Sequence, residues 1–391
     1  MFQKGLNQKL VCLSIAAGFS TAASAEYALG DGLQYGSDSD WASVNVSTRF
    51  QMRYVSDFDD EPLEADDFIN GDDTKKFSFN RSRIKADGHI YKPWLKYFTQ
   101  FELGDGFFLD YGIAIEKYDW LNVKVGQWKL EYSRERVISS GKQQMLDRSI
   151  INRMFTIDRH NAASVYGRFN EDTLADISYW AGVGSGNGRG NGLSGDGKPL
   201  YFGRIQWNPL GGGVDWTASD LEGHDEPALS IAYSRSVSEG AFTRFSSSGG
   251  GQLDWWRAED DQVNHIRQFN YDVAFMYKGF SAQAEYHEKR VTTDTQPGIS
   301  LRGYYVQGGY FLHNAFDWIP KQLEIAGRYA TYDQSKGYSA KKNEEQAVAL
   351  NWFFAGHDSK ITLDYTRFDL NAETKREYDD DRVRLQYDVS F

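Results

Sequence analysis

Cysteine is almost absent from this sequence. Its 391 residues contain one, Cys12, which lies among the first 25 residues. The chain after residue 25 therefore has no thiol for an intrachain disulfide or a thiolate metal site. The 7 histidines are scattered, and no H-E-x-x-H spacing occurs. We therefore expect neither a metal site nor a cofactor.

Long apolar runs and proline are also scarce. The mean hydropathy is −0.60, and no segment reaches the roughly 20 apolar residues that a membrane-spanning helix needs. The chain has 7 prolines and 38 glycines, and 15% of its residues are aromatic. Few prolines suit long strands, and Tyr and Trp favour membrane–water interfaces. The composition therefore disfavours a helical membrane protein and is compatible with long strands joined by tight turns.

The first 25 residues have the pattern of a secretory signal peptide. Lys4 and Lys9 precede a short apolar run over residues 10–19, and Ala23-Ser24-Ala25 forms an A-x-A cleavage site. A lipoprotein signal is the alternative, but Cys12 lies at the start of the apolar run, where cleavage should not occur. We predict a signal peptide over 1–25 and a single domain over 26–391. Removing the two lysines changes the formal charge from −12 to −14.

The last ten residues alternate strictly between polar and apolar side chains and end on Phe391. Alternation with a period of two predicts a strand with one polar and one apolar face. Similar segments recur along the chain, separated by polar turns, which is typical of an outer-membrane β-barrel. We predict an all-β, 16-stranded antiparallel transmembrane barrel with strands near 44–54, 77–92, 93–104, 108–119, 120–130, 161–169, 173–183, 199–208, 228–237, 269–279, 280–290, 300–312, 320–333, 343–354, 359–369 and 380–391.

The connections between these segments are alternately long and short. Long polar ones are expected over 57–76, 131–160, 184–198, 238–268, 334–342 and 370–379. Outer-membrane barrels have long extracellular loops and short periplasmic turns, so we place the long loops outside the cell. A C-terminal strand ending in Phe391 resembles the signal read by the barrel-assembly machinery of Gram-negative bacteria.

Basic residues are concentrated on the faces predicted to line the lumen. By alternation these are Arg49, Arg53, Arg81, Arg83, Lys85, Arg204, Arg328, Arg382 and Arg384. Arg81, Arg83 and Lys85 would form a column with a spacing of about 6.6 Å. Such a column would attract anions and pass them between sites. The alternative is that these side chains pair with lumen acids such as Glu102, Asp110, Glu116 and Glu324 and only brace the wall.

The long connection that follows residue 129 has two interpretations. It is rich in basic residues, including Lys142, Arg148 and Arg159. It could fold inward and narrow the pore, with Lys142 and Arg148 at the constriction, or it could be an ordinary surface loop. Acidic clusters over 57–73 and 379–381 are expected in exterior loops. They could be a solvated surface bridged by divalent cations to lipopolysaccharide, or a vestibule that attracts cations.

Sequence patterns typical of catalysis are weak. Residues 190–195 match G-x-G-x-x-G, but no strand–helix context surrounds them, which favours a flexible loop. His287, His313 and Ser281 cannot be combined into a catalytic triad from the sequence. An outer-membrane enzyme or an adhesin built on a barrel therefore remains only as an alternative of another class.

Residues 79–88 (FNRSRIKADG) form an arginine-rich strand segment, and residues 125–129 (VGQWK) end a later strand and are followed by Ser139-Ser140. These segments resemble the second strand and a later strand end of the phosphate-selective porin O and P family. Residues 146–148 (LDR) and 155–159 (FTIDR) look like its third-loop pattern. The resemblance implies a trimeric 16-stranded channel with an inward-folded third loop. It places Arg81 and Arg83 on an arginine ladder and Arg148 at the constriction.

We therefore predict an outer-membrane porin for the passive diffusion of small anions, first among them phosphate or polyphosphate. The expected partners are outer-membrane lipid, lipopolysaccharide, small anions and two further copies of the chain in a homotrimer, with no nucleic acid. Expected pore-lining residues are Arg49, Arg53, Arg81, Arg83, Lys85, Lys142, Arg148, Arg159, Arg382 and Arg384. The alternative is a porin that is weakly selective or prefers cations, with its arginines neutralised by lumen acids.

Overall fold

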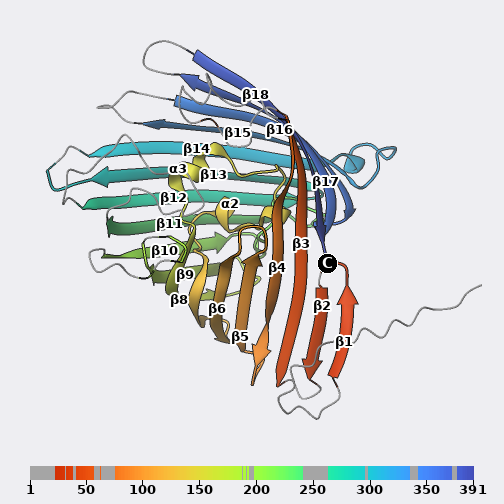
Figure 1. Cartoon of the computed structure of the whole chain (residues 1–391), viewed down its shortest axis with the longest axis vertical. Coiled ribbons are helices and arrows are strands. Elements are labelled where there is room, and N and C mark those ends of the chain that lie inside the picture. Colours follow the sequence, from red (N-terminus) through yellow and green to blue (C-terminus); the bar gives the residue numbers. More distant parts are fainter. Residues whose placement is uncertain are drawn as a thin grey trace, which may run out of the picture.

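Sixteen antiparallel strands form a closed barrel, seen obliquely in Figure 1. The computed structural model describes residues 23–30, 32–37, 41–56, 62, 75–186, 188–190, 192, 198–240, 263–295, 298–334, 342–371 and 377–391. The last strand pairs with the third along residues 383–390 and 49–56, and this pairing closes the barrel. None of the helices in these ranges is long and apolar enough to span a membrane.

The barrel strands coincide with the 16 predicted segments, with differences of a few residues at their ends. They are β3 (Ala42–Ser56), β4 (Lys76–Ile90), β5 (Leu95–Glu102), β6 (Phe107–Tyr118), β7 (Leu121–Lys129), β8 (Arg159–Phe169), β9 (Asp176–Gly184), β10 (Lys198–Asn208), β11 (Ala228–Gly240), β12 (Asn264–Tyr277), β13 (Phe280–Thr292), β14 (Ile299–Phe311), β15 (Leu323–Gln334), β16 (Lys342–Ala355), β17 (Ser359–Asn371) and β18 (Glu377–Ser390). The predicted fold class is confirmed.

Two short strands at the N-terminal end were not predicted. β1 (Ala23–Ala28) and β2 (Gly32–Ser37) form a hairpin. β2 pairs with residues 43–46 of β3, below the part of β3 that pairs with β18. Figure 1 shows the hairpin beside the lower part of β3. Residues 1–22 of the predicted signal peptide lie outside the described residues, so the boundary at residue 25 stays a prediction.

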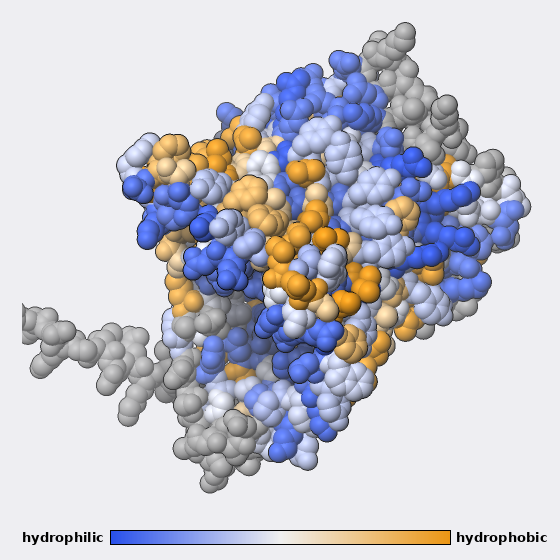
Figure 2. Space-filling view, turned by 180° about the vertical axis from the view of Figure 1, so that it is seen from behind, coloured by the Kyte–Doolittle hydropathy of each residue, from blue (hydrophilic) through white to orange (hydrophobic). Residues whose placement is uncertain are grey.

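Strand alternation gives the wall two different faces. In β12 the even-numbered residues are buried toward the lumen, and the odd-numbered residues lie outside. The turn between β12 and β13 contains only Lys278 and Gly279, whose φ angles are 48° and 76°. Two successive positive φ values are typical of the tight hairpin turns that match the twist of antiparallel strands. Figure 2 shows apolar residues gathered in the middle of the rear face, with hydrophilic residues toward its right-hand edge.

The third loop, residues 130–158, folds into the barrel, as predicted. It contains α2 (Arg134–Val137), the short 3-10 helix η1 (Ser140–Lys142) and α3 (Ile150–Phe155), which lie inside the ring of strands in Figure 1. Residues 150, 151, 154 and 155 are buried against apolar lumen residues of β12–β15, including Ile266, Val291, Leu301 and Tyr332. The loop therefore forms an apolar core with the lumen face of β12–β15.

A second segment enters the lumen from the periplasmic end. Residues 209–227 connect β10 to β11, and this connection is not among the long ones expected from the sequence. The buried Arg134 guanidinium donates hydrogen bonds to the carbonyl oxygens of Val214 and Thr217, each at 3.1 Å. It also lies 5.5 Å from the ring centroid of Trp216. One buried arginine of the third loop thus holds this segment beneath the loop.

We predict that the third-loop core contributes strongly to stability. The Phe155 side chain is 1% exposed in this core, so Phe155→Ala should lower the free energy of unfolding by about 3–5 kcal/mol, through lost burial and a residual cavity. The measurement is urea unfolding of the purified protein in detergent micelles, followed by intrinsic fluorescence. The matched control is Phe316→Ala, whose side chain is 50% exposed and should change the free energy by about 0.5 kcal/mol or less. Equal losses in both variants would contradict this role of the core.

Candidate functional site

The open half of the lumen lies between the third loop and the wall formed by β3–β8. Two cavities of about 520 Å³ each occupy it. The upper cavity lies toward the long loops, and the lower cavity lies toward the periplasm. We call the two cavities together the basic passage, because cationic side chains dominate the lining of both.

Ten basic side chains line the upper cavity, against three carboxylates. The basic residues are Arg53, Lys76, Arg81, Arg83, Lys129, Arg136, Arg148, Arg153, Arg159 and Arg189. The carboxylates belong to Glu102, Asp105 and Asp147. This excess of positive charge inside a low-dielectric wall favours anions over cations.

Seven basic side chains line the lower cavity, against two carboxylates. The basic residues are Arg49, Arg83, Lys85, Lys124, Lys129, Lys142 and Arg159. The acids are Asp110 and Glu131. Arg83, Lys129 and Arg159 line both cavities, so their charges lie where the two meet.

The third loop touches the opposite wall at this junction. The Arg49 guanidinium of β3 donates to the hydroxyls of Ser139 (2.9 Å) and Ser140 (2.6 Å). Arg83 of β4 donates to the same Ser140 hydroxyl at 3.4 Å. A Cβ atom at Gly141 would lie 2.4 Å from Arg49 Nη1, so glycine allows this close approach. Two guanidinium groups and two hydroxyls thus meet where the two cavities adjoin.

Several of the arginines have acidic partners, in line with the wall-bracing alternative. Arg83 Nε lies 2.6 Å from Glu102, and Arg159 Nε lies 2.8 Å from Asp110. Lys85 lies 2.8 Å from Asp87, with both side chains partly exposed. Of the other two acids considered, Glu116 pairs with Lys96 and Glu324 accepts hydrogen bonds from neutral side chains. Some of the basic residues that line the passage are therefore paired with acids of the wall, as the bracing alternative predicts.

Asp147 of the third loop is surrounded by three arginines. Arg53 lies 2.7 Å away, Arg384 lies 2.5 Å away and Arg81 lies 3.5 Å away. Burial alone would raise the pKa of the Asp147 carboxyl, but these arginines outweigh burial and hold that pKa well below its usual range. Asp147 therefore stays ionised and fastens the loop to β3, β4 and β18.

Other cations of the passage have no carboxylate partner among the described residues. Lys142 is exposed in the lower cavity. Arg148 donates to the backbone carbonyls of Glu135 (2.9 Å) and Ile138 (2.6 Å). Lys129 donates to the carbonyl of Ile138 at 3.3 Å. Carbonyl groups orient these side chains without cancelling their charge, so net positive charge remains beside the passage.

Two of the expected pore residues lie elsewhere. Arg382 and Arg384 do not line either of these cavities. The Arg382 guanidinium lies 5.0 Å from the ring centroid of Phe368. Arg384 forms hydrogen bonds with Asp364 at 3.0 and 2.7 Å, in addition to its contact with Asp147. Both side chains are almost fully buried.

Sequence alternation missed Lys129. Val123 and Val125 of β7 are exposed on the outside, and a strict period of two would place Lys129 with them. Gly126 has a φ angle of 144°, which interrupts the regular alternation, and Lys129 lines both cavities. Arg189 was missed for another reason: it lies in the connection after β9, where no strand period applies, 3.6 Å from the ring centroid of Phe107.

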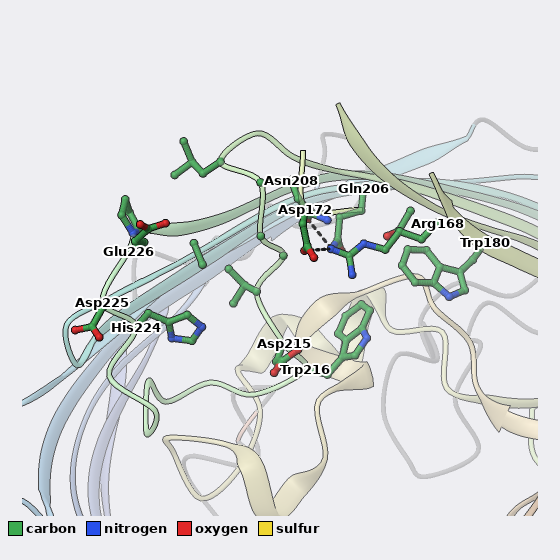
Figure 3. A pocket seen from close by; sticks show the side chains of 18 residues that line it. Arg168, Asp172, Trp180, Gln206, Asn208, Asp215, Trp216, His224, Asp225 and Glu226 are labelled. Carbon is green, nitrogen blue, oxygen red and sulfur yellow. Dashed lines mark hydrogen bonds and ion pairs between the residues drawn. The ribbon is translucent and has the colours of Figure 1, made fainter. Parts of the chain in front are cut away.

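A third cavity, of about 500 Å³, has the opposite character. Figure 3 shows it beside the segment 209–227, with Arg168, Trp180 and Trp216 on one side. Its lining includes four carboxylates, those of Asp172, Asp215, Asp225 and Glu226. Across the described residues no group of three or more potential ligands could hold a metal ion.

The family model for the phosphate-selective porins O and P matches residues 48–391. This chain belongs to that porin family. Membership and the barrel fold place it in the outer membrane of a Gram-negative bacterium. A comparison with curated proteins found no match.

Solved structures of outer-membrane proteins share the fold. A loop-deletion mutant of OmpT from Vibrio cholerae aligns with a TM-score of 0.59 at 11% identity, covering 90% of this chain and 100% of that chain. The anion-selective porin from Comamonas acidovorans gives 0.58 at 11% identity, with the same two coverages. The channel DcaP of Acinetobacter baumannii gives 0.55 at 14% identity, covering 91% of this chain and 99% of that chain. At 11–14% sequence identity, these comparisons show only that the barrel fold is shared.

Asp147→Asn should increase the preference of this porin for anions. The substitution removes the negative charge beside Arg53, Arg81 and Arg384 while keeping the side-chain shape. One unit charge about 7 Å from a passing ion is worth roughly 0.6 kcal/mol in water, with opposite sign for an anion and a cation, so the anion-to-cation permeability ratio should rise about sevenfold. The reversal potential under a KCl gradient measures this ratio. Asp172→Asn, in the acid-rich third cavity, is the matched control, and a larger shift in the control would refute the assignment.

Proposed function

We propose that this porin mediates passive diffusion of small anions through the basic passage, with phosphate or polyphosphate as preferred solutes. The observation that carries the proposal is the junction of the two cavities. There Arg49 and Arg83 meet the hydroxyls of Ser139 and Ser140, and Lys129 and Arg159 line both sides.

An anion entering the junction loses part of its hydration shell. Guanidinium, ammonium and hydroxyl donors compensate that loss, and donors above and below let the anion move stepwise. Passage also requires that the anion can leave. Glu102 and Asp110 offset part of the charge of Arg83 and Arg159, which keeps binding weak enough for release.

The geometry of the donors favours an oxyanion over a halide. A guanidinium presents parallel N–H groups that match two oxygens of one phosphate. Serine hydroxyls add donors that can turn toward the remaining oxygens. Arg81 and Arg83 supply such forks in the upper cavity, while Arg49, Lys85 and Lys142 continue the positive charge in the lower cavity.

The short strands on one side of the barrel support the proposed homotrimer. Within the wall β5–β9, the strands β5, β7 and β9 have 8, 9 and 9 residues and alternate with β6 and β8, which have 12 and 11. Three of these five strands are at or below the roughly 9–11 residues that a tilted strand needs to cross a bilayer. Contact between copies at this low wall would shield it from lipid. Recognition of Phe391 by the barrel-assembly machinery stays part of the proposal, as does contact with lipopolysaccharide.

A channel that prefers cations is the second candidate. The carboxylates of the third cavity, Asp172, Asp215, Asp225 and Glu226, favour it. The third cavity lies beside segment 209–227, away from the junction of the other two cavities. Its carboxylates therefore do not neutralise the arginines at the junction. Family and fold favour transport over catalysis as the activity.

Conductance in planar bilayers tests the proposal. Under a KCl gradient the reversal potential should lie on the anion side, and phosphate should block the chloride current. Arg81→Ala with Arg83→Ala should weaken this block about a hundredfold or more, because two lost charge-assisted hydrogen bonds are together worth roughly 3–6 kcal/mol. Arg302→Ala, on the outer surface of β14, is the matched control and should leave the block unchanged.

The contrary outcomes separate the candidates. A reversal potential on the cation side would support the second candidate. An unchanged block in the double variant would make Arg81 and Arg83 structural residues. A folded protein with no conductance would favour an enzyme or an adhesin on a barrel.

A further inference from the structure

Four arginines lie on the outer surface of adjacent strands, where a bilayer-spanning wall should be apolar. They are Arg235 of β11, Arg267 of β12, Arg290 of β13 and Arg302 of β14, and all are exposed. Their neighbours in sequence, such as Ile266, Lys289 and Leu301, are buried in the lumen. We call these four residues the outer arginine patch.

The strand register brings like charges together within this patch. Arg267 of β12 lies directly across from Arg290 of β13. On its other side Arg267 pairs with Val237 of β11, and Arg235 lies two residues from Val237 on the same face of that strand. Like charges directly opposite each other on a sheet destabilise it. Arg235, Arg267 and Arg290 have no carboxylate partner within the described ranges, so an external anion would relieve their repulsion.

Carboxylates near the patch are engaged with other groups or lie at its edge. Glu288 lies 3.3 Å from Arg302, and Asp333 is across from Arg302. Glu239 is bound by Lys198 at 2.6 Å and also lies near His265, which in turn lies 3.0 Å from Asp294. The positive charge without a direct partner is thus concentrated on the three strands β11–β13.

The patch lies just above a band of aromatic side chains on the same outer face. Arg235 follows Tyr233 by two residues, Arg267 precedes Phe269 by two and Arg302 precedes Tyr304 by two. Tyr233 and Phe269 rings lie 6.5 Å apart, and those of Phe269 and Tyr286 lie 6.3 Å apart. Aromatic girdles mark the boundary between acyl chains and headgroups. The patch is therefore about 6.6 Å beyond that boundary, on the side of the long loops, at headgroup height.

The wall that carries the patch is tall enough to face lipid. β11, β12, β13 and β14 have 13, 14, 13 and 13 residues, more than the roughly 9–11 that cross a bilayer. The low wall of β5, β7 and β9 is a different part of the barrel. Lipid is therefore the expected neighbour of the patch, and a second copy of the chain is not.

We propose that three members of the outer arginine patch, Arg235, Arg267 and Arg290, bind the phosphate groups of a phosphorylated glycolipid of the outer leaflet, that is, the lipid A part of lipopolysaccharide, whereas Arg302 is engaged by Glu288. Arg235, Arg267 and Arg290 donate guanidinium forks to the phosphates. The aromatic band below packs against the upper part of the acyl chains. Binding of this lipid stabilises the tall wall and is independent of anion passage through the lumen.

Binding of purified bisphosphorylated lipid A to the detergent-solubilised protein tests this proposal. Arg267→Gln with Arg290→Gln should weaken binding about thirtyfold, since each basic residue near an anionic membrane surface contributes about 1 kcal/mol. The matched control is Arg302→Gln with Arg367→Gln, two outer arginines that already have carboxylate partners. The control should lose about threefold or less. Conductance should be unchanged in both double variants, which also shows that the barrels are folded.

Three results would overturn the proposal. The first is equal affinity of the wild type and the Arg267/Arg290 variant. The second is competition by inorganic phosphate, which would indicate a site for the free ion. The third is loss of the oligomer in the variant with unchanged lipid affinity, which would indicate contact between copies. If the variant does not fold, the wild-type protein is tested with two lipids. Lipid A without its phosphates should bind at least about tenfold more weakly than bisphosphorylated lipid A. Equal binding of the two lipids would refute the proposal.

Discussion

Burial of the apolar side of the third loop against one wall of the lumen is the interaction on which the rest of the structure depends. Residues of α3 such as Ile151 and Phe155 would be unstable in a water-filled pore. They pack on apolar lumen residues of β12–β15, and the loop is thereby drawn to one side. The two cavities of the basic passage lie on the opposite side, between the loop and β3–β8.

The same asymmetry divides the arginines of the lumen into two sets. On the packed side Arg204 pairs with Asp272, Arg328 with Glu345, and Arg384 with Asp364. Away from water a charge without a partner would be costly, so pairing there is required. On the open side water can hydrate the charged groups. Lys142, Arg148 and Lys129 have no carboxylate partner there among the described residues. One protein thus uses basic side chains both as braces and as the lining of a passage.

The barrel could be predicted from the sequence because strand alternation is local. Most of the 16 strands carry a two-residue period of their own, and the connection after residue 129 has more basic residues than any other predicted long connection. Features that depend on contacts between distant segments could not be predicted. Segment 209–227 enters the lumen because Arg134, far away in sequence, binds its carbonyl groups. Lys129 reaches the passage because the backbone at Gly126 interrupts the period. The β1–β2 hairpin is too short to show a clear alternation.

Alternation identifies two faces of a strand, but the medium beside each face changes along the barrel. In β14, Leu301 faces the lumen because the apolar third loop is its neighbour there, and Arg302 faces outward. A rule that places arginine in the pore and leucine in lipid would invert this strand. Near the aromatic band the outer medium changes from acyl chains to charged headgroups, and arginine becomes favourable outside. Whether a charged side chain points into the lumen or outward therefore depends on its height in the membrane and on what fills the lumen at that height. Strand periodicity alone specifies neither of these.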